Sequence, residues 1–166
     1  HATLRRSNEV PYAVDGLPEY NETEPNGTVE DAQPLDLPLI VNGRVGQPGD
    51  VDVFRFEGRA GDELVAEVVA RKLRSPLDSL LRLTDESGEV LEFNDDSMLK
   101  DGHLHKGAGT LTHHADSYLS VELPEDGTYY VHLSDSQNHG GQTYAYRLRI
   151  SPPRSDFALR VTPSSI

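Results

Sequence analysis

The segment YAYRLRI at residues 144–150 alternates large apolar side chains with small or charged ones. In an extended chain its tyrosines, leucine and isoleucine share one face, and its alanine and two arginines share the other. This period of two predicts a strand with one buried face. The same alternation recurs at residues 117–123 and 157–162, and no window favours an amphipathic helix of more than two turns.

Short runs rich in valine, leucine, phenylalanine and tyrosine recur from Leu35 onward, separated by clusters of Gly, Pro, Asp and Asn. This spacing is typical of strands joined by turns. It predicts strands near residues 39–45, 51–57, 63–71, 79–85, 89–93, 117–123, 128–135, 143–150 and 157–162. About nine short strands with no helix between them predict an all-β fold, a β-sandwich of the jelly-roll type.

Residues 1–21 are polar and show no periodic pattern, so we expect a linker or an extended arm there. A single sandwich domain is then expected over residues 22–162, since 166 residues suit one domain. The chain begins at His1 rather than Met and shows no signal-like segment. We therefore expect it to be a piece of a longer protein whose export signal lies elsewhere.

Charge and composition exclude several classes of function. The chain carries 28 acidic and 15 basic residues, a net charge of −13, which disfavours nucleic acid and anionic membranes as partners. No apolar run approaches the roughly 20 residues that membrane insertion needs. The absence of cysteine excludes a disulfide scaffold and a thiolate metal site. Carboxylates gathered in loops instead suit a hard cation such as calcium.

The first acidic cluster is Glu22-Thr23-Glu24-Pro25-Asn26. Pro25 favours an extended conformation at Glu24, and in an extended segment Glu22, Glu24 and Asn26 point the same way. Three oxygen-bearing side chains on one side form half of a calcium cage. The alternative interpretation is a solvated acidic linker.

The second acidic group is Asp50 and Asp52, ahead of Phe54 and Phe56. If the two phenylalanines face the core, Asp52 lies on the same face at the start of the strand, with Asp50 two residues earlier. A carboxylate that points inward needs hydrogen bonds or a metal. The alternative is that both aspartates cap the turn through side-chain hydrogen bonds to the backbone.

A further set of polar residues falls at strand ends and in turns. If the strands pair as a meander, these residues meet at one end of the sandwich, where they either ligate a cation or, in the case of Asp78 and Asp116, simply anchor loop backbone. The set consists of Asp78, Asn94, Asp95, Asp96 and Asp116.

Four of the seven histidines, His103, His105, His113 and His114, lie in the long segment 97–116. No H-E-x-x-H pair accompanies them, so we expect a solvent-exposed loop rather than a zinc site. A loop of this length is usually functional or mobile. No nucleophile elbow or phosphate loop is present either, so the sequence predicts no enzyme. A metal-dependent hydrolase that uses this loop is the catalytic alternative.

Taken in order, the motifs resemble the bacterial pre-peptidase C-terminal domain over about residues 22–150. The resemblance rests on residues 22–26, 48–56, 75–79, 94–96, 116–117, 126–131 and 144–148. It implies a jelly-roll sandwich without catalytic residues, similar to the collagen-binding domains of clostridial collagenases. In those domains an E-x-E-x-N-D-type segment and a D-x-D-type turn bind calcium.

By this resemblance, Glu22, Glu24, Asn26 and the Asp50/Asp52 pair are the candidate calcium ligands. The sequence departs from the family pattern at Gly27, where an acidic or amide residue often follows the asparagine. One side-chain ligand is therefore missing.

The function expected from the sequence is a non-catalytic, calcium-stabilised accessory module of a larger secreted, periplasmic or cell-surface protein. Its partners are the other domains of the same chain, whose folding, secretion or attachment it supports. The alternative is a module that binds an extracellular carbohydrate polymer or protein ligand, for which Tyr118, Tyr129 and Tyr130 supply stacking faces. That alternative requires the tyrosines to cluster on one exposed face of a sheet.

Overall fold

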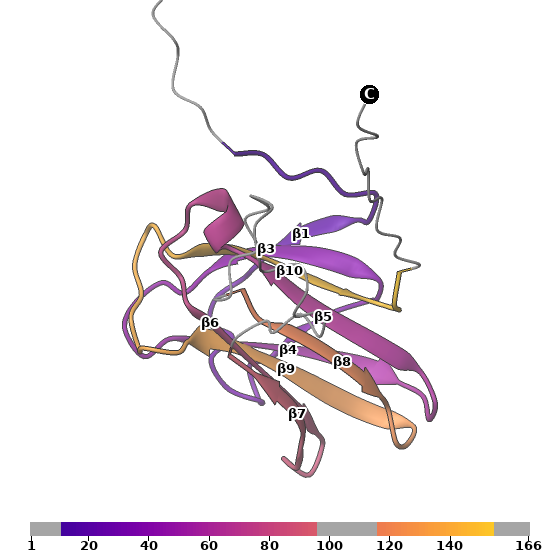
Figure 1. Ribbon diagram of the computed structural model, residues 1–166. Helices are drawn as coiled ribbons and strands as arrows, with labels where there is room; N and C mark the ends of the chain where they lie inside the picture. The colour runs from indigo at the N-terminus through magenta and orange to yellow at the C-terminus, as the bar shows by residue number, and fades with distance from the viewer. Residues whose placement is uncertain (1–10, 96–115, 155–166) are drawn as a thin grey trace, which may run out of the picture.

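A computed structural model of the chain describes residues 11–95 and 116–154. Its elements are strands, apart from a single short 3-10 helix among the described residues (Figure 1). They are β1 (Glu19–Asn21), β2 (Gln33–Pro34), β3 (Leu39–Arg44), β4 (Val51–Gly58), β5 (Glu63–Val69), η1 (Arg71–Leu73), β6 (Ser79–Asp85), β7 (Val90–Asn94), β8 (Tyr118–Glu122), β9 (Gly127–Asp135) and β10 (Ala145–Ser151).

The strands form two five-stranded sheets, which Figure 1 shows as stacked layers. The first sheet has the order β1-β3-β10-β5-β8, and the second has the order β2-β4-β9-β6-β7. From β3 to β10, consecutive strands alternate between the sheets, except for the β6–β7 hairpin. The predicted β-sandwich is confirmed, and its jelly-roll type stays a prediction.

Eight of the nine strands predicted from the sequence are present, with ends that differ by at most two residues. The strand expected at 143–150 begins at residue 145, and the one expected at 63–71 ends at 69, where η1 takes over. The ninth strand, at 157–162, lies outside the described residues. So do Asp96 and the four histidines of the 97–116 segment.

The core lies between the two inner faces of the sheets. Phe54 and Phe56 of β4 are buried, and the Phe56 ring stacks on Tyr129 of β9 with centroids 5.8 Å apart. From the facing sheet, Tyr146 and Leu148 of β10 enter the same core. The faces predicted for β4 and β10 are therefore confirmed, and this places Asp52, on the same face as Phe54, inside the sandwich.

The N-terminal arm contacts both sheets. β1 pairs in parallel with β3, and β2 pairs in parallel with β4. Between them the chain covers the outer face of the second sheet, where Ala32, Val53 and Tyr130 form a small buried cluster. Residues 19–21, expected in an arm or linker, are extended and hydrogen-bonded to the sheet.

The arm also covers a residue that the alternation assigns to the solvent face. Arg149 of β10 is only 8% exposed, and its Nε lies 3.5 Å from Asp15 Oδ2. The same carboxylate lies 3.4 Å from Nη1 of Arg154, just after β10. The entering and leaving segments of the chain are therefore joined by ion pairs. None of the described residues belongs to a helix long and apolar enough to span a bilayer.

Candidate metal centre

Three carboxylates come together where the N-terminal arm meets β4. Each of Glu22, Glu24 and Asp52 offers an oxygen within 4.8 Å of the others. Glu22 directly follows β1, and Asp52 is the second residue of β4. Within residues 11–95 and 116–154, no other group of three acidic or histidine side chains converges in this way.

Asp52 is fully buried, and its two oxygens have different surroundings. Oδ2 accepts a hydrogen bond of 2.6 Å from the Tyr146 hydroxyl, across the core on β10. Oδ1 is buried without a hydrogen-bond partner. Burial, and then the neighbouring Glu22 carboxylate, raise the pKa of Asp52 to about 9. The charged form of this carboxylate therefore lacks a compensating positive group.

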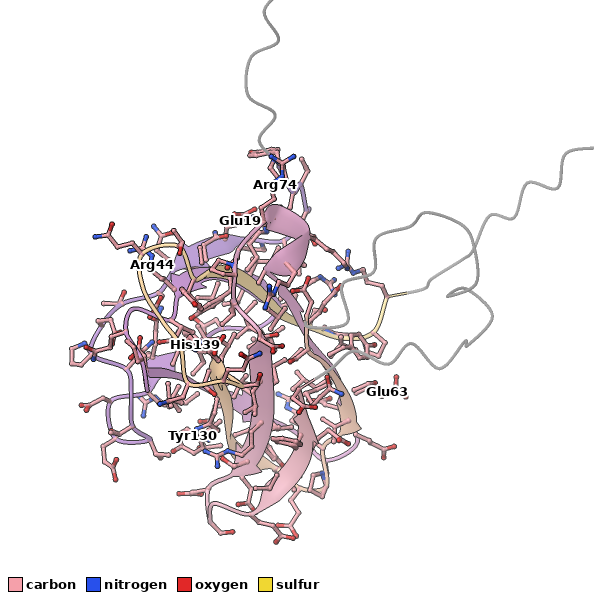
Figure 2. The ribbon with its side chains drawn as sticks, turned by 60° about the vertical axis from the view of Figure 1, so that its left-hand side comes forward. Glu19, Arg44, Glu63, Arg74, Tyr130 and His139 are labelled. Atoms are coloured by element: carbon pink, nitrogen blue, oxygen red, sulfur yellow. The ribbon has the colours of Figure 1, made fainter. Side chains whose placement is uncertain are left out.

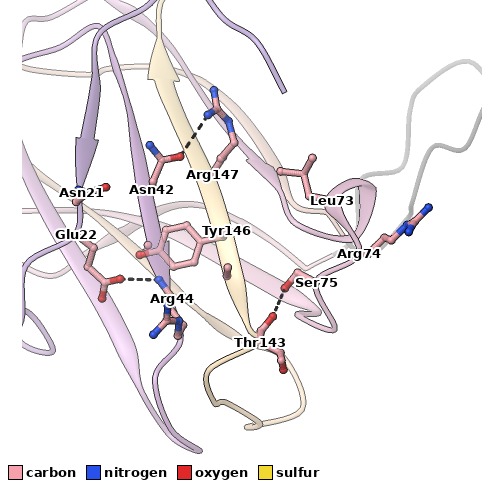
Figure 3. Close-up of a pocket in the computed structure, with 12 residues that line it drawn as sticks. Asn21, Glu22, Asn42, Arg44, Leu73, Arg74, Ser75, Thr143, Tyr146 and Arg147 are labelled. Atoms are coloured by element: carbon pink, nitrogen blue, oxygen red, sulfur yellow. Dashed lines mark hydrogen bonds between the residues drawn. The ribbon is translucent and has the colours of Figure 1, made fainter. Parts of the chain in front are cut away.

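Glu22 and Glu24 each accept a backbone hydrogen bond at one carboxylate oxygen. Oε2 of Glu22 accepts a hydrogen bond of 2.6 Å from the Arg44 N–H, whereas its Oε1 is buried and unpaired (Figure 3). Burial raises the pKa of Glu22. Oε2 of Glu24 accepts a hydrogen bond of 2.9 Å from the N–H of Asn26. Each backbone hydrogen bond fixes one oxygen of a glutamate and leaves the other available.

Asn26 is fully buried. Its backbone carbonyl accepts a hydrogen bond of 2.9 Å from the Val53 N–H, which places it beside β4. Neither its amide oxygen nor its amide nitrogen has a hydrogen-bond partner. Asp50 differs from these residues. Its Oδ2 accepts a hydrogen bond of 2.6 Å from the Gly46 N–H, so it caps the turn, as the alternative interpretation expected. Its charge nonetheless acts to raise the pKa of Asp52.

The residues present fit a hard divalent cation. Unpaired buried oxygens of Glu22, Asn26 and Asp52 are costly, and so is repulsion among carboxylates this close. A cation that prefers oxygen ligands removes both costs, and calcium takes 6–8 of them. The set contains no histidine, which distinguishes it from the usual zinc sites. The Asn26 amide nitrogen is a donor, so a cation satisfies only its oxygen partner.

Sequence reasoning missed two residues that shape this centre. Tyr146 was assigned only to the core, yet its hydroxyl holds Asp52. The second residue is Gly43 of β3, which lies against Tyr146 and Glu22. A Cβ at Gly43 would overlap the Tyr146 hydroxyl and lie 2.6 Å from Glu22 Oε2. Tyr146 carried one signal, a polar tip on an inward-facing strand position, which requires a buried partner.

Two described members of the remaining polar set, Asp116 and Asn94, anchor backbone through their side chains. Asp116 accepts hydrogen bonds from the N–H groups of Ala70 at 3.2 Å and Arg71 at 2.8 Å, at the start of η1. Asn94 Oδ1 accepts one from the Tyr118 N–H at 3.1 Å. Asp116 therefore anchors loop backbone, which is the alternative to a cation site that the sequence left open for it, and Asn94 holds the start of β8.

The segments around Asp78 and Asp116 do meet, but through their serines. Ser117 N–H donates to Ser79 Oγ at 2.8 Å, and the Ser117 hydroxyl donates to the Ser79 carbonyl. Asp78 Oδ2 accepts a hydrogen bond from Gln137 Nε2 at 2.9 Å. Asp95 is exposed and joins no described metal-ligating group.

The tyrosines proposed as stacking faces do not form a common surface. Tyr129 is 2% exposed in the core, and Tyr130 is 9% exposed beneath the arm. Tyr118, on β8, is 42% exposed. These three tyrosines therefore do not supply the cluster on one exposed face that the carbohydrate-binding alternative requires.

Comparisons with known proteins agree with this architecture. A probable subtilase-type serine protease of Deinococcus radiodurans is 37% identical over 114 residues, which are 67% of this chain and 14% of that protein. The crystal structure of the pre-peptidase C-terminal domain of a collagenase from Bacillus anthracis superposes with a TM-score of 0.50 at 15% identity. The match covers 72% of this chain and 94% of that domain, and it supports the fold alone.

A sequence model of the bacterial pre-peptidase C-terminal domain matches residues 50–135, slightly more than half of the chain. The chain belongs to this family of non-catalytic accessory domains. The match begins at Asp50 and ends at Asp135, so it includes β4 through β9 but not the arm that carries Glu22, Glu24 and Asn26.

Proposed function

We propose that this domain is a calcium-stabilised accessory module of a larger exported protein, without catalytic activity of its own. The observation that carries the proposal is the pair of buried oxygens without partners, Glu22 Oε1 and Asp52 Oδ1, at the convergence of three carboxylates, together with the buried, unpaired amide of Asn26, two residues after Glu24. Bound calcium would be held by Glu22, Glu24, Asn26 and Asp52. It would supply the positive charge that this buried cluster lacks.

The position of the cluster explains what calcium would do there. Glu22 and Asn26 belong to the arm, Asp52 belongs to β4 of one sheet, and its hydrogen-bond partner Tyr146 belongs to β10 of the other. One ion would therefore crosslink the arm to the sandwich. Because calcium binds the folded form, it stabilises the domain by mass action.

The larger context is inferred from the family and the relative. The chain spans only 14% of the length of the matched protease, so the remainder of such a protein consists of other segments. We infer that this domain accompanies a peptidase-like or similar exported protein and supports its folding, secretion or attachment. Its partners are then the neighbouring domains, and its location is extracytoplasmic: secreted, periplasmic or on the cell surface.

Isothermal titration of the chelator-treated domain with calcium tests the proposal. We expect one ion per chain, together with a rise in melting temperature. Glu24→Ala and Asp52→Ala should each abolish the binding heat and most of the thermal gain, because each removes a carboxylate from the only converging group described.

Matched controls separate this site from the other acidic residues. Asp95→Ala and Asp78→Ala should bind calcium as the wild type does, because neither side chain belongs to the converging group. His103→Ala, in the 97–116 segment, should also leave binding unchanged. Equal melting temperatures of the wild type in calcium and in chelator would refute the proposal. Loss of calcium binding in Asp95→Ala but not in Asp52→Ala would place the calcium site in the further set of polar residues that contains Asp95 instead.

A further inference from the structure

A groove on the outer face of the first sheet is lined by more basic than acidic side chains, although the chain as a whole is acidic. Its volume is about 740 Å³. Three arginines line it, Arg44, Arg74 and Arg147, against one acidic residue, Glu22. The chain as a whole carries 28 acidic and 15 basic residues. A basic groove on an acidic protein favours an anionic ligand.

The floor of the groove is the solvent face of β3 and β10. In the pairing of these strands Arg44 stands opposite Ala145, and Asn42 stands opposite Arg147. Ala145 is exposed and has a small side chain, so it leaves the floor open beside Arg44. The floor thus presents two arginines on neighbouring strands (Figure 3).

The wall opposite β1 is the turn formed by η1 and the residues that follow it. Asp116 caps the start of η1, and Ser75 Oγ donates to the Thr143 carbonyl at 3.3 Å. These bonds fix the turn against the end of the loop that precedes β10. Figure 2 shows Glu19, Arg44 and Arg74 on the same side of the molecule, away from Glu63. The groove is therefore built from anchored elements.

The two floor arginines differ in what they already bind. Arg147 donates from both Nη atoms to Glu19, at 3.0 Å each, which holds its guanidinium in place. The exposed guanidinium of Arg44 makes no ion pair or hydrogen bond to any described residue. Arg44 is thus a cation with donors to spare, beside one that is already oriented.

We propose that this groove binds an extended acidic peptide segment, with Arg44 as its principal anchor and Arg147 as the second. Arg44 and Arg147 are diagonal neighbours on paired strands, a spacing of about 7–8 Å between backbone positions. In an extended peptide, alternate side chains project to one side about 7 Å apart. Acidic residues two positions apart therefore match the two arginines.

A peptide fits the lining better than a saccharide does. Protein sites for sugars commonly offer an aromatic face to the ring, and the only aromatic residue in this lining is Tyr146, which is 3% exposed. The lining instead supplies polar groups that hydrogen-bond peptide groups, such as the side-chain amide of Asn21. The inference goes beyond the calcium proposal and does not depend on it.

Titration of the calcium-loaded domain, followed by amide NMR, with acetyl-Thr-Glu-Thr-Glu-Thr-amide tests the inference. We expect saturable shifts centred on Arg44 and Ala145, and binding that weakens as NaCl rises from ~0.05 to ~0.5 M. The Gln-for-Glu version of the peptide should bind at least about tenfold more weakly, because it loses its charge-assisted hydrogen bonds. A version with the two glutamates adjacent should also bind more weakly.

Variants locate the contact. Arg44→Gln should weaken binding about tenfold, and Ala145→Phe should weaken it by filling the floor. Arg59→Gln, an exposed arginine outside the groove, should leave binding unchanged. Melting temperature and calcium stoichiometry of each variant should equal those of the wild type, so that a failed calcium site is recognised separately.

Three results would overturn the inference. The first is equal binding of the Glu and Gln peptides, and the second is wild-type affinity in both Arg44→Gln and Ala145→Phe. The third is binding of a galacturonic acid oligosaccharide through Arg44 with no binding of the peptide, which would make the groove a site for an acidic sugar.

Discussion

Gly43 is the residue on which the geometry of the metal centre depends most closely. It has no side chain at the point where the Tyr146 hydroxyl and Glu22 Oε2 approach the backbone of β3. Tyr146 in turn donates to Asp52, so one glycine sets the position of two carboxylates from different parts of the chain. The site therefore depends on a residue that offers no ligand.

Gly43→Ala tests this dependence. A Cβ at this position displaces Tyr146 or Glu22, and overpacking of this kind costs about 1–3 kcal/mol in the free energy of unfolding. We expect that loss in urea denaturation, together with weaker calcium binding. Gly127→Ala is the matched control, because a Cβ there meets nothing within 4 Å. Equal stability of the two variants would show that β3 adjusts without cost.

His132 is a second residue with a measurable consequence. It is 7% exposed on β9, between Val53 of β4 and Arg82 of β6, and a ring nitrogen shares a hydrogen bond of 3.1 Å with Thr84 Oγ1. Burial, and then the Arg82 charge, lower the pKa of His132 to about 4. The folded domain therefore keeps this histidine neutral where the unfolded chain protonates it.

The sign of the pH effect follows from this difference. Above pH 6.5 both states are neutral and His132 contributes nothing to the pH dependence of stability. As pH falls from about 6.5 to about 4, only the unfolded state takes up the proton, so the folded domain loses up to about 3 kcal/mol. We expect His132→Gln to remove that loss. Urea denaturation of both proteins in calcium at several pH values measures it, and parallel profiles would contradict it.

At the scale of the elements, the alternation of apolar and polar residues predicted the long strands but did not predict the short strands β1 and β2. β4, β9 and β10 each have seven or more residues with a buried inner face, and their ranges were found from the sequence. β1 has three exposed residues, and β2 has two, one of them Pro34. Their position is set by parallel pairing with β3 and β4, a long-range interaction that leaves no local period.

Long-range contacts of the arm also explain why the burial of two residues was not predicted. Tyr130 and Arg149 fall on outer faces, as alternation predicts, yet both are buried because the arm covers them. The candidate ligands, by contrast, were singled out because carboxylates near an inward strand position need a partner whatever the tertiary contacts, and their binding of a cation stays a prediction. Which of them converge required the structure: Glu22, Glu24 and Asp52 do, and Asp50 caps a turn instead.

The ion pairs of Asp15 provide a prediction for the arm as an element. Its carboxylate lies near both Arg149, whose side chain is 10% exposed, and Arg154, whose side chain is 52% exposed. Burial acts to raise the pKa of Asp15, but hydrogen bonds from Gly16 and Leu17 and the two arginine charges lower it below its usual value. The pair with Arg149 is less screened by solvent than the pair with Arg154.

Double-mutant cycles with Asp15→Asn measure the two couplings. We expect about 1 kcal/mol or more for the cycle with Arg149→Gln, because it leaves a buried charge unpaired, and below about 0.5 kcal/mol for the cycle with Arg154→Gln. The measurement is the free energy of unfolding in urea at low salt. A larger coupling for Arg154 than for Arg149 would contradict the assignment of the arm contact to β10.

At the scale of the whole molecule, net charge gives calcium two routes to stabilise the fold. A chain with a net charge of −13 repels itself, so any salt that screens this repulsion favours the compact state. A specific ion between Glu22, Glu24 and Asp52 adds a separate stabilisation that depends on the ion's affinity rather than on ionic strength. The two routes are distinguishable because they respond differently to the identity of the cation.

Thermal melting at a constant ionic strength of ~0.15 M separates these routes, because screening is then fixed. Calcium at a hundredfold excess over its Kd should stabilise the domain by about 2.7 kcal/mol. For a domain of this size that corresponds to a rise of about 5–11 °C in Tm.

Magnesium should give a much smaller rise, because it demands a small octahedral site and gives up its water reluctantly. Asp52→Asn, which keeps the shape of the side chain and cannot ionise to bind a cation, should lose the calcium response while retaining the response to NaCl. Equal gains from calcium and magnesium in the wild type, retained in Asp52→Asn, would mean that the acidic surface as a whole, rather than the buried cluster, accounts for the effect of calcium.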